Sequence, residues 1–337
     1  MLLETIKQLS ELQGVSGCEE QVRFEILNKI EGHCIYKVDA LGNILAFKKG
    51  RHEPKQKLML SAHMDEVGLI ITYAEEDGLL RFSPVGGIDK RVIVGRTVRI
   101  GDVYGVIGMK AIHLRSKEEK DKPVDSEKLT IDIGARNREE ALNAVSLGDR
   151  AVFTSRYSEF GDGFICGRAL DDRAGCALMI DLILGELEYD THFAFTVQEE
   201  TGTTGAKTAA AQICPDIAIA IETTTAGDLP DAAPSKTVCS LKQGPVLSFM
   251  DRGTIYDRSL YQKALEVAKE ASIRCQIKAG VYGGNEARSV QVAGNGARVL
   301  VVSLPCRYLH TPNCVIHRSD AEETARFLPA LIRAFGE

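Results

Sequence analysis

The sequence predicts an α/β protein: a mixed, largely parallel sheet sandwiched by helices, with a small β-barrel domain inserted into it. Two observations predict this. From residue 163 onward, continuous apolar segments alternate with segments of helical periodicity, as expected for parallel strands covered on both faces. Between residues 69 and 162 the pattern changes to short alternating stretches punctuated by glycine, such as LLRFSPV and KLTIDIGA, which favours a small barrel or sandwich.

The N-terminal region predicts two helices followed by strands. MLLETIKQLSEL has the periodicity of an amphipathic helix. A second helix is expected to open at Ser16, with Glu19 three positions later as in a capping box. Strands are expected around Ile35 to Phe47 and over Lys57 to Ala62.

The remaining elements follow in order. Strands are expected over Phe193–Val197, Ile217–Ile221 and Arg298–Leu304, and helices over residues 173–187, 257–272 and 320–335. The polar segment RSKEEKDKPVDSEK, residues 115–128, is predicted to be a solvated loop. The chain therefore divides into one domain made of residues 1–68 and 163–337 and an inserted β domain of residues 69–162.

Composition restricts the possible functions. The 337 residues are 44% hydrophobic and 26% charged, as in an ordinary globular protein, and the net charge of -6 without a basic stripe argues against nucleic acid or an anionic membrane as partner. Glu4 and Lys7 interrupt the N-terminal apolar residues, so we expect no signal peptide, and no apolar run reaches transmembrane length. Nine cysteines without a CxxC pair predict reduced thiols and a cytoplasmic location.

The first candidate site lies in KLMLSAHMDEVG, residues 57–68. His63 and Asp65 are two residues apart and share a face if the strand persists. A carboxylate there can accept the ring N–H of His63 and fix its tautomer, which is the usual support of a metal-binding imidazole. An ordinary histidine and aspartate at a strand end are the alternative interpretation.

Acidic residues or histidines also follow other apolar segments. Glu199 and Glu200 end FAFTVQEE, the run DIAIAIE ends at Glu222, and His310 follows the last strand. In ALDDR, either aspartate could be the N-cap of the next helix, or one could cap while Asp171 points outward as a ligand.

These residues are expected to meet, because ligands of open α/β sheets bind at the carboxyl ends of the strands. Clustered carboxylates would be electrostatically costly without cations. Two divalent ions would offset that cost, and nitrogen plus carboxylate ligands suit zinc, cobalt or manganese better than calcium. One of the two adjacent glutamates would then bind metal, and its neighbour would handle protons.

The motifs AHMDEVG, ALDDR, VQEETGTTGA and RYLHTP, in this order, resemble family 42 of the metallopeptidases. These are cobalt- or zinc-dependent aminopeptidases, including glutamyl aminopeptidases, that build tetrahedral shells. The resemblance covers nearly the whole chain, including GVIG and IDIGA in the β domain. It implies a zinc-exopeptidase-like fold, peptide substrates, two divalent ions per subunit, and self-association through the inserted domain into dimers and a dodecamer.

The resemblance also implies roles for individual residues. The ligands of one metal would be His63, Asp171 and Glu222, and those of the other Asp171, Glu200 and His310, with Asp171 bridging. Glu199 would be the general base, and Asp65 would orient His63. Two ions about 3.5 Å apart would share a hydroxide and polarise the scissile carbonyl, while Glu199 takes the proton and passes it to the leaving amine. That the free α-amino group is held, which makes the enzyme an aminopeptidase, also rests on the resemblance.

The sequence departs from the family pattern at three places, of which the first concerns a metal ligand, the second substrate preference, and the third has no assigned role. Many relatives have aspartate at the position of Glu222, and GGNEARSV, residues 283–290, differs from a family stretch written with threonine, aspartate and glycine. Cys314 stands where a glutamate is frequent. Candidates for favouring acidic substrates are Arg252, Arg288 and Arg307.

Other functions stay open at this point. A carboxypeptidase or a deacylase could use the same metal pair. A glycoside hydrolase could use Glu199 and Glu200, and some relatives carry endoglucanase labels, but such an enzyme has no need of His63 or His310. A non-catalytic binding protein would leave the carboxylates unexplained. A dinucleotide fold is disfavoured because GNGARV, residues 294–299, precedes a strand instead of following one.

Overall fold

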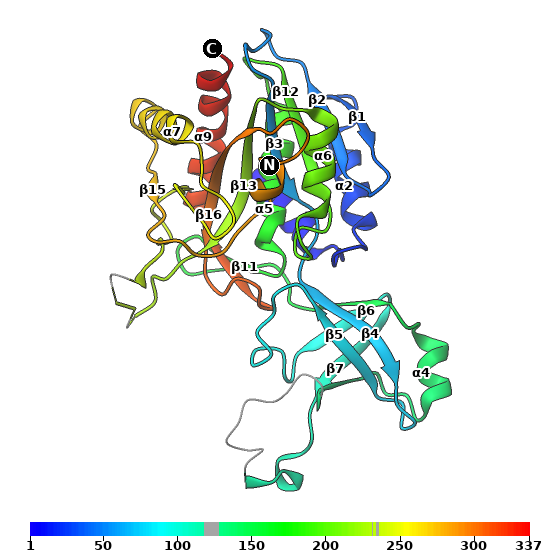
Figure 1. Ribbon diagram of the computed structural model, residues 1–337. Helices are drawn as coiled ribbons and strands as arrows, with labels where there is room; N and C mark the ends of the chain where they lie inside the picture. Colours follow the sequence, from blue (N-terminus) through cyan, green and yellow to red (C-terminus); the bar gives the residue numbers. More distant parts are fainter. Residues whose placement is uncertain (118–127, 231, 234–235) are drawn as a thin grey trace.

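The computed structural model describes residues 1–117, 128–230, 232–233 and 236–337. It consists of a large α/β domain and a smaller β-barrel that projects from one end of it (Figure 1). The predicted fold class is confirmed. Residues 118–127 of the predicted polar loop lie outside the described residues.

The α/β domain is built on one eight-stranded sheet in the order β1-β2-β12-β3-β13-β16-β14-β15. Its strands are β1 (Ile35–Val38), β2 (Ile44–Lys48), β3 (Leu58–His63), β12 (Thr191–Thr196), β13 (Ile217–Thr225), β14 (Val246–Leu247), β15 (Gln276–Ile277) and β16 (Arg298–Cys306). The four central strands, β12, β3, β13 and β16, are parallel to one another, so their carboxyl ends lie at the same edge.

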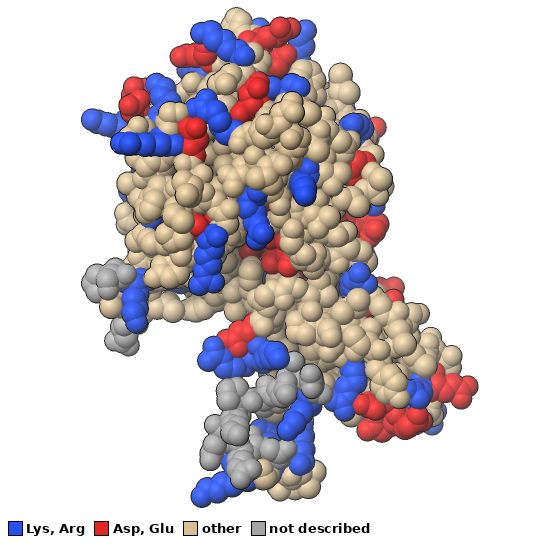
Figure 2. Space-filling view, viewed as in Figure 1, with Lys and Arg blue, Asp and Glu red and all other residues tan. Residues whose placement is uncertain are grey.

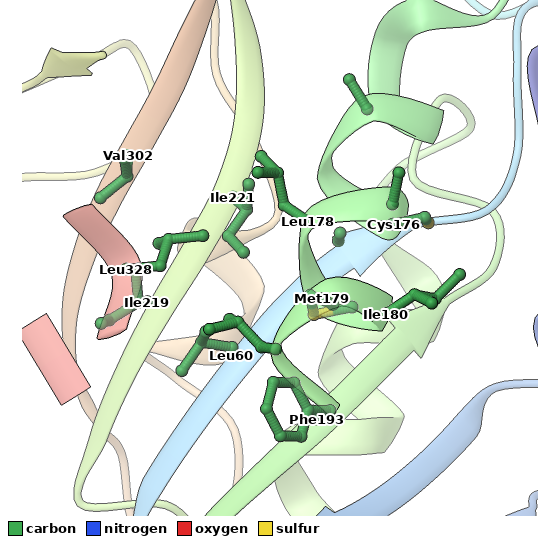
Figure 3. Packing of buried hydrophobic residues seen from close by; sticks show 14 of the residues in the cluster. Leu60, Cys176, Leu178, Met179, Ile180, Phe193, Ile219, Ile221, Val302 and Leu328 are labelled. Carbon is green, nitrogen blue, oxygen red and sulfur yellow. The ribbon is translucent and has the colours of Figure 1, made fainter. Parts of the chain in front are cut away.

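Helices cover both faces of the sheet. They are α1 (Leu2–Glu11), α2 (Glu20–Ile30), α5 (Leu170–Leu184), α6 (Thr204–Ile213), α7 (Arg258–Glu270), α8 (Ala287–Val290) and α9 (Arg318–Gly336). Along β13, Ile219 and Ile221 face the core beneath α5 and α9, whereas Ala218 and Ala220 face α6 and α8, as the two-residue period of a strand requires. Figure 3 shows the larger core, in which Leu178 of α5 lies near Ile221.

The inserted domain is a closed six-stranded barrel in the order β4-β5-β8-β7-β6-β9. Its elements are β4 (Gly68–Ala74), β5 (Leu80–Val85), β6 (Thr97–Ile100), β7 (Val103–Gly108), the 3-10 turn η1 (Ile112–Leu114), β8 (Thr130–Asp132), α4 (Arg138–Ala144) and β9 (Arg150–Phe153). Apolar side chains such as Leu69, Leu80 and Ile131 fill its interior. A separate three-stranded sheet joins β10 (Ser158–Phe160), β11 (Phe164–Gly167) and β17 (Cys314–His317) beneath the large sheet.

The predicted capping box is wrong. The second helix begins at Glu20, and the Ser16 hydroxyl donates instead to the Asp65 carboxylate, 2.5 Å away. The Glu19 carboxylate accepts from the backbone amides of Gly17 and Gln198. Both side chains serve partners distant in sequence, and these tertiary contacts take precedence over the local helix start.

Charged side chains of both signs are interspersed over the face of the molecule in Figure 2. Among the described residues, no helix combines the length and the apolar character needed to cross a bilayer.

Candidate metal centre

The candidate residues collect at the carboxyl edge of the four central strands. His63 is the last residue of β3, Glu199 and Glu200 follow β12, and His310 lies in the loop between β16 and β17. The expectation that its strand ends at Glu222 is wrong, because β13 continues to Thr225 and these threonines pair with the end of β16. Since Ala220 pairs with Ser61, His63 and Glu222 stand side by side on neighbouring strands.

Asp171 lies between the two histidines. Its Oδ1 atom is 3.5 Å from Nε2 of His63, and its Oδ2 atom is 3.3 Å from Nε2 of His310. Nε2 of His63 is also 3.8 Å from Oε2 of Glu222, and Nε2 of His310 is 3.4 Å from Oε2 of Glu200. These separations are long for hydrogen bonds. Two ligands of one tetrahedral zinc, each about 2.1 Å from the ion, stand roughly 3.4 Å apart, so the observed distances suit shared cations.

The two adjacent aspartates, Asp171 and Asp172, make different contacts. Asp172 Oδ1 accepts a hydrogen bond from the amide of Gly175, 3.1 Å away and three residues on, as a capping side chain does, while Asp171 faces the histidines. Asp172 is nevertheless close to the cluster, because one ligand atom each from His63, Asp172 and Glu222 lie within 4.8 Å of one another. The same limit holds for His63, Asp171 and Glu200.

Several acidic oxygens in this cluster have no hydrogen-bond partner among the described residues. They are Asp171 Oδ1, Asp172 Oδ2 and Glu286 Oε1, all buried. An unpartnered buried carboxylate is unfavourable unless it is protonated or binds a cation. Imidazole and carboxylate groups are the ligands of zinc, cobalt and manganese, so the residues present fit a pair of such ions.

The electrostatics of the metal-free site show the same need for positive charge. Burial raises the pKa of Glu199 to about 7 and that of Glu200 to about 8. Burial alone would lower the pKa of His310, but its contacts with Asp171 and Glu200 raise that pKa to about 10. The same balance, with Asp171 and Asp65 as partners, raises the pKa of His63. These shifts favour protonated side chains in the absence of a cation, and a bound cation would displace those protons.

Asp65 organises the turn that carries both glutamates. Its Oδ1 accepts the backbone N–H of Glu199 at 2.9 Å, and its Oδ2 accepts that of Glu200 at 3.1 Å. Nδ1 of His63 lies 3.1 Å from the backbone carbonyl oxygen of Asp65 and 3.4 Å from its Oδ1. Asp65 therefore contacts His63 and also determines how the chain turns after β12.

A buried ion network anchors the segment after His63. Arg173, which is fully buried, donates to the carbonyl oxygens of Met64 and Leu9, at 2.7 and 2.6 Å. Glu66 pairs with Arg168 and accepts the amide of Gly14. The end of α1 and the turn after β3 are thereby tied to the first turn of α5, which carries Asp171.

Two residues of GGNEARSV, the segment that differs from the family pattern, lie in different environments. Glu286 is fully buried behind the cluster, where its Oε2 accepts the hydroxyl of Thr196 at 2.6 Å and its amide nitrogen is 3.4 Å from Oε1 of Glu222. No periodicity in the sequence indicated that this glutamate lies against Glu222. Arg288 is exposed, as is Arg252 in the loop that contacts it, whereas Arg307 pairs with Asp228 at 2.7 Å.

Comparison with known proteins gives a consistent result. The sequence model of the M42 glutamyl aminopeptidase family matches residues 42–327. A putative aminopeptidase of Acetivibrio thermocellus is 38% identical, with 97% of both chains aligned. The lysyl aminopeptidase of Pyrococcus furiosus is 33% identical, over 98% of this chain and 96% of its own.

Solved structures agree with these sequence matches. The TET1 peptidase of Pyrococcus horikoshii, described as able to assemble into a tetrahedron or a large octahedral shell, superimposes with a TM-score of 0.88 at 36% identity, over 98% of this chain and 99% of that chain. PhTET1-12s, a dodecamer, gives 0.87 at 36% identity and 98% coverage of both chains. A Thermotoga maritima structure named as an endoglucanase gives 0.81 at 38% identity, over 97% and 96% of the chains.

Proposed function

The chain belongs to the M42 glutamyl aminopeptidase family and is an aminopeptidase, and from this membership we propose that it removes N-terminal residues from peptides with two divalent metal ions. The observation that supports the metal pair best is the position of Asp171, whose two carboxylate oxygens face different histidines. His63 and Glu222 would complete one ligand set, and Glu200 and His310 the other. Zinc or cobalt, with manganese as a further option, suits these ligands.

When bound, the ions would supply Lewis acidity, polarising the scissile carbonyl and lowering the pKa of an attacking water that they share. Glu199 would act as general base at its carboxylate, taking the proton from that water and delivering it to the leaving amine. Its neighbour Glu200 would be a ligand, so the turn held by Asp65 gives two adjacent residues different tasks. Asp65 would also fix the orientation of His63 through Nδ1.

A preference for acidic first residues is part of this proposal. Arg252 lies in a loop and Arg288 in the short helix α8, and the two segments are adjacent: the amide of Arg252 donates to the carbonyl of Gly283, and the stem of Arg288 lies close to Gly253. Glu286, whose amide contacts Glu222, is two residues before Arg288, and this nearness in sequence supports the assignment. The guanidinium of Arg307 is already paired, so it is a weaker candidate.

The proposal also covers the oligomeric state of the protein and its location in the cell. Self-association, with the dodecamer as the expected form, is supported by the PhTET1-12s dodecamer and by the shells of the TET1 peptidase. We assign this role to the inserted domain, through which subunits pair in the family that the sequence resembles. A cytoplasmic location is supported by the nine cysteines, none of which belongs to a CxxC pair.

The deciding experiment uses a panel of aminoacyl-nitroanilides and short peptides with free or acetylated N-termini. We expect chelation to abolish hydrolysis, cobalt or zinc to restore it, and acetylated peptides to be resistant. Removal of C-terminal residues from the acetylated peptides would indicate a carboxypeptidase on the same centre, and release of acetate from their N-termini would indicate a deacylase. Activity on cellulose derivatives that chelators leave unchanged would instead support the glycoside hydrolase, whose chemistry leaves His63 and His310 without a task.

A further inference from the structure

The inserted barrel reaches back to the candidate metal centre through the loop between β5 and β6. A Cβ atom added to Gly87 would lie only 3.3 Å from Nδ1 of His310. One added to Gly86 would lie 3.2 Å from Cβ of Glu200 and 3.4 Å from its Oε2. The two side chains that these added atoms would crowd are those assigned, together with Asp171, to the same ion.

The barrel is tied to the centre at a second point. Only four residues, 64–67, separate His63 at the end of β3 from Gly68 at the start of β4. Val67 in this link also lies against the loop, because its Cγ1 would be 2.8 Å from a Cβ on Gly86. Figure 1 shows the barrel below the α/β domain, with its upper rim facing the region where β16 ends.

The two histidines are supported differently. His63 has a side-chain exposure of 1%, and its Nδ1 lies 3.1 Å from the carbonyl oxygen of Asp65. His310 has an exposure of 35%, and its Nδ1 makes no hydrogen bond to any residue that the structure describes. Gly87 is near that nitrogen, close enough that an added Cβ would lie in tight contact with it. On its Nδ1 side His310 is therefore confined by a segment of the inserted domain, whereas Nδ1 of His63 is held by its own turn.

From these contacts we propose that the Gly86–Gly87 segment of the inserted barrel positions His310 and Glu200, so that one of the two metal sites is complete only when the barrel is docked. This inference rests on the ligand assignment of the proposed function. Gly86 has a φ of +81°, which favours glycine for its backbone conformation. Gly87 is not among the positive-φ residues, so space beside the imidazole is the reason for glycine there.

A side chain at position 87 must displace the imidazole by a few tenths of an ångström. Because metal ligands tolerate little misplacement, loss of a residue that orients a ligand typically weakens metal binding about 10- to 100-fold. The Gly87→Ala protein is therefore expected to bind one ion as the unchanged protein does and the second about 10-fold or more weakly. The ion held by His63, Asp171 and Glu222 should be affected little.

The test is a titration of metal-free protein with zinc by calorimetry, repeated with cobalt, whose visible absorption reports the geometry of each filled site. The unchanged protein, Gly87→Ala, Gly108→Ala and His310→Ala are compared. Gly108 in β7 is the matched control, because a Cβ there meets nothing within 4 Å and its φ is not left-handed. Retention of the first ion by Gly87→Ala verifies that the variant is folded.

The outcomes separate this inference from the proposed function. We expect two ions for the unchanged protein and Gly108→Ala, one for His310→Ala, and one tight plus one weak for Gly87→Ala. Two equally tight ions in Gly87→Ala, or an equal loss of both, would overturn the positioning role while leaving the metal pair intact. Equal ion counts for the unchanged protein and His310→Ala would refute the proposed metal pair itself.

Discussion

Oδ1 of Asp65 lies 2.9 Å from the backbone nitrogen of Glu199 and accepts its hydrogen bond. The other oxygen accepts the amide of Glu200, so a single carboxylate on the turn after β3 holds the turn after β12. This contact allows two adjacent residues to serve one site, although neighbours in an extended strand point to opposite faces. It also makes the geometry of the candidate base depend on a residue distant in sequence.

The first prediction concerns that contact. Asp65→Asn replaces one acceptor with an NH₂ group that faces an N–H donor, so the turn must shift. We expect metal affinity to fall about 10- to 100-fold and hydrolysis to fall at least as much. Calorimetric zinc titration and nitroanilide assays measure both. Asp77→Asn, in an exposed turn where the carboxylate accepts only the amide of Leu79, is the control and should match the unchanged protein.

A second experiment should distinguish the roles of the two adjacent glutamates, Glu199 and Glu200. Glu199→Gln removes the proposed base but no ligand, so the protein should keep both ions and lose about 10²- to 10⁴-fold in kcat. Glu200→Gln removes a ligand and should reduce the metal content to one ion per chain. Elemental analysis measures the metal content of both variants, and steady-state kinetics measures their kcat. If Glu199→Gln loses an ion and Glu200→Gln keeps both, the two roles must be exchanged.

Metal uptake should depend on pH. In the metal-free protein the pKa of Glu200 is raised to about 8 and that of His310 to about 10, so both ligands are largely protonated at pH 7. A cation must displace these protons, and its affinity should therefore rise as pH rises from 6 to 8, about tenfold per unit for each proton released. Calorimetry in buffers of different ionisation enthalpy counts the protons. Binding that releases none would contradict this account of the site.

The proposed role of the two exposed arginines can be tested through substrate preference. If Arg252 and Arg288 bind an acidic side chain, Arg288→Ala should lower kcat/KM for glutamyl-nitroanilide about tenfold relative to leucyl-nitroanilide. An exposed charge on α9, Arg326, provides a control with the same change in net charge. If the unchanged protein hydrolyses lysyl or leucyl substrates faster than glutamyl substrates, the proposed acidic preference is wrong. The proposed metal centre is not affected by that result.

A stability prediction addresses the buried network. Arg173→Met leaves Glu66 with one partner fewer and removes the guanidinium donor from the carbonyls of Leu9 and Met64. Removing one member of a buried charge network lowers the free energy of unfolding by about 3–5 kcal/mol. Urea denaturation of the metal-free protein measures this change. Arg136→Ala, which breaks an exposed pair with Glu140, should change the same quantity by less than about 1 kcal/mol.

Much of the fold could be predicted because the signals are local. The apolar runs before His63, Glu199 and Glu222 define buried strands, and helices alternate with them, so a parallel sheet with its acidic edge follows. The helix α6 (Thr204–Ile213) was not predicted, because its first residues read as a glycine- and threonine-rich loop. In the structure this helix is held by packing of small residues such as Ala206 and Ala210 against the sheet, a contact that no local pattern shows.

The sequence by itself determined the candidate metal ligands and that most of them come with apolar strands, because the two-residue alternation of a strand and the order of the segments can be read from the chain alone. Only the tertiary structure decided which oxygen of Asp171 faces which histidine, that Ser16 bonds Asp65 and does not cap a helix, and that a side chain at position 87 would crowd His310. These contacts join segments that are distant in the sequence, in one case more than two hundred residues apart. Their distances depend on how the sheet, helices and barrel pack together, which periodicity cannot specify.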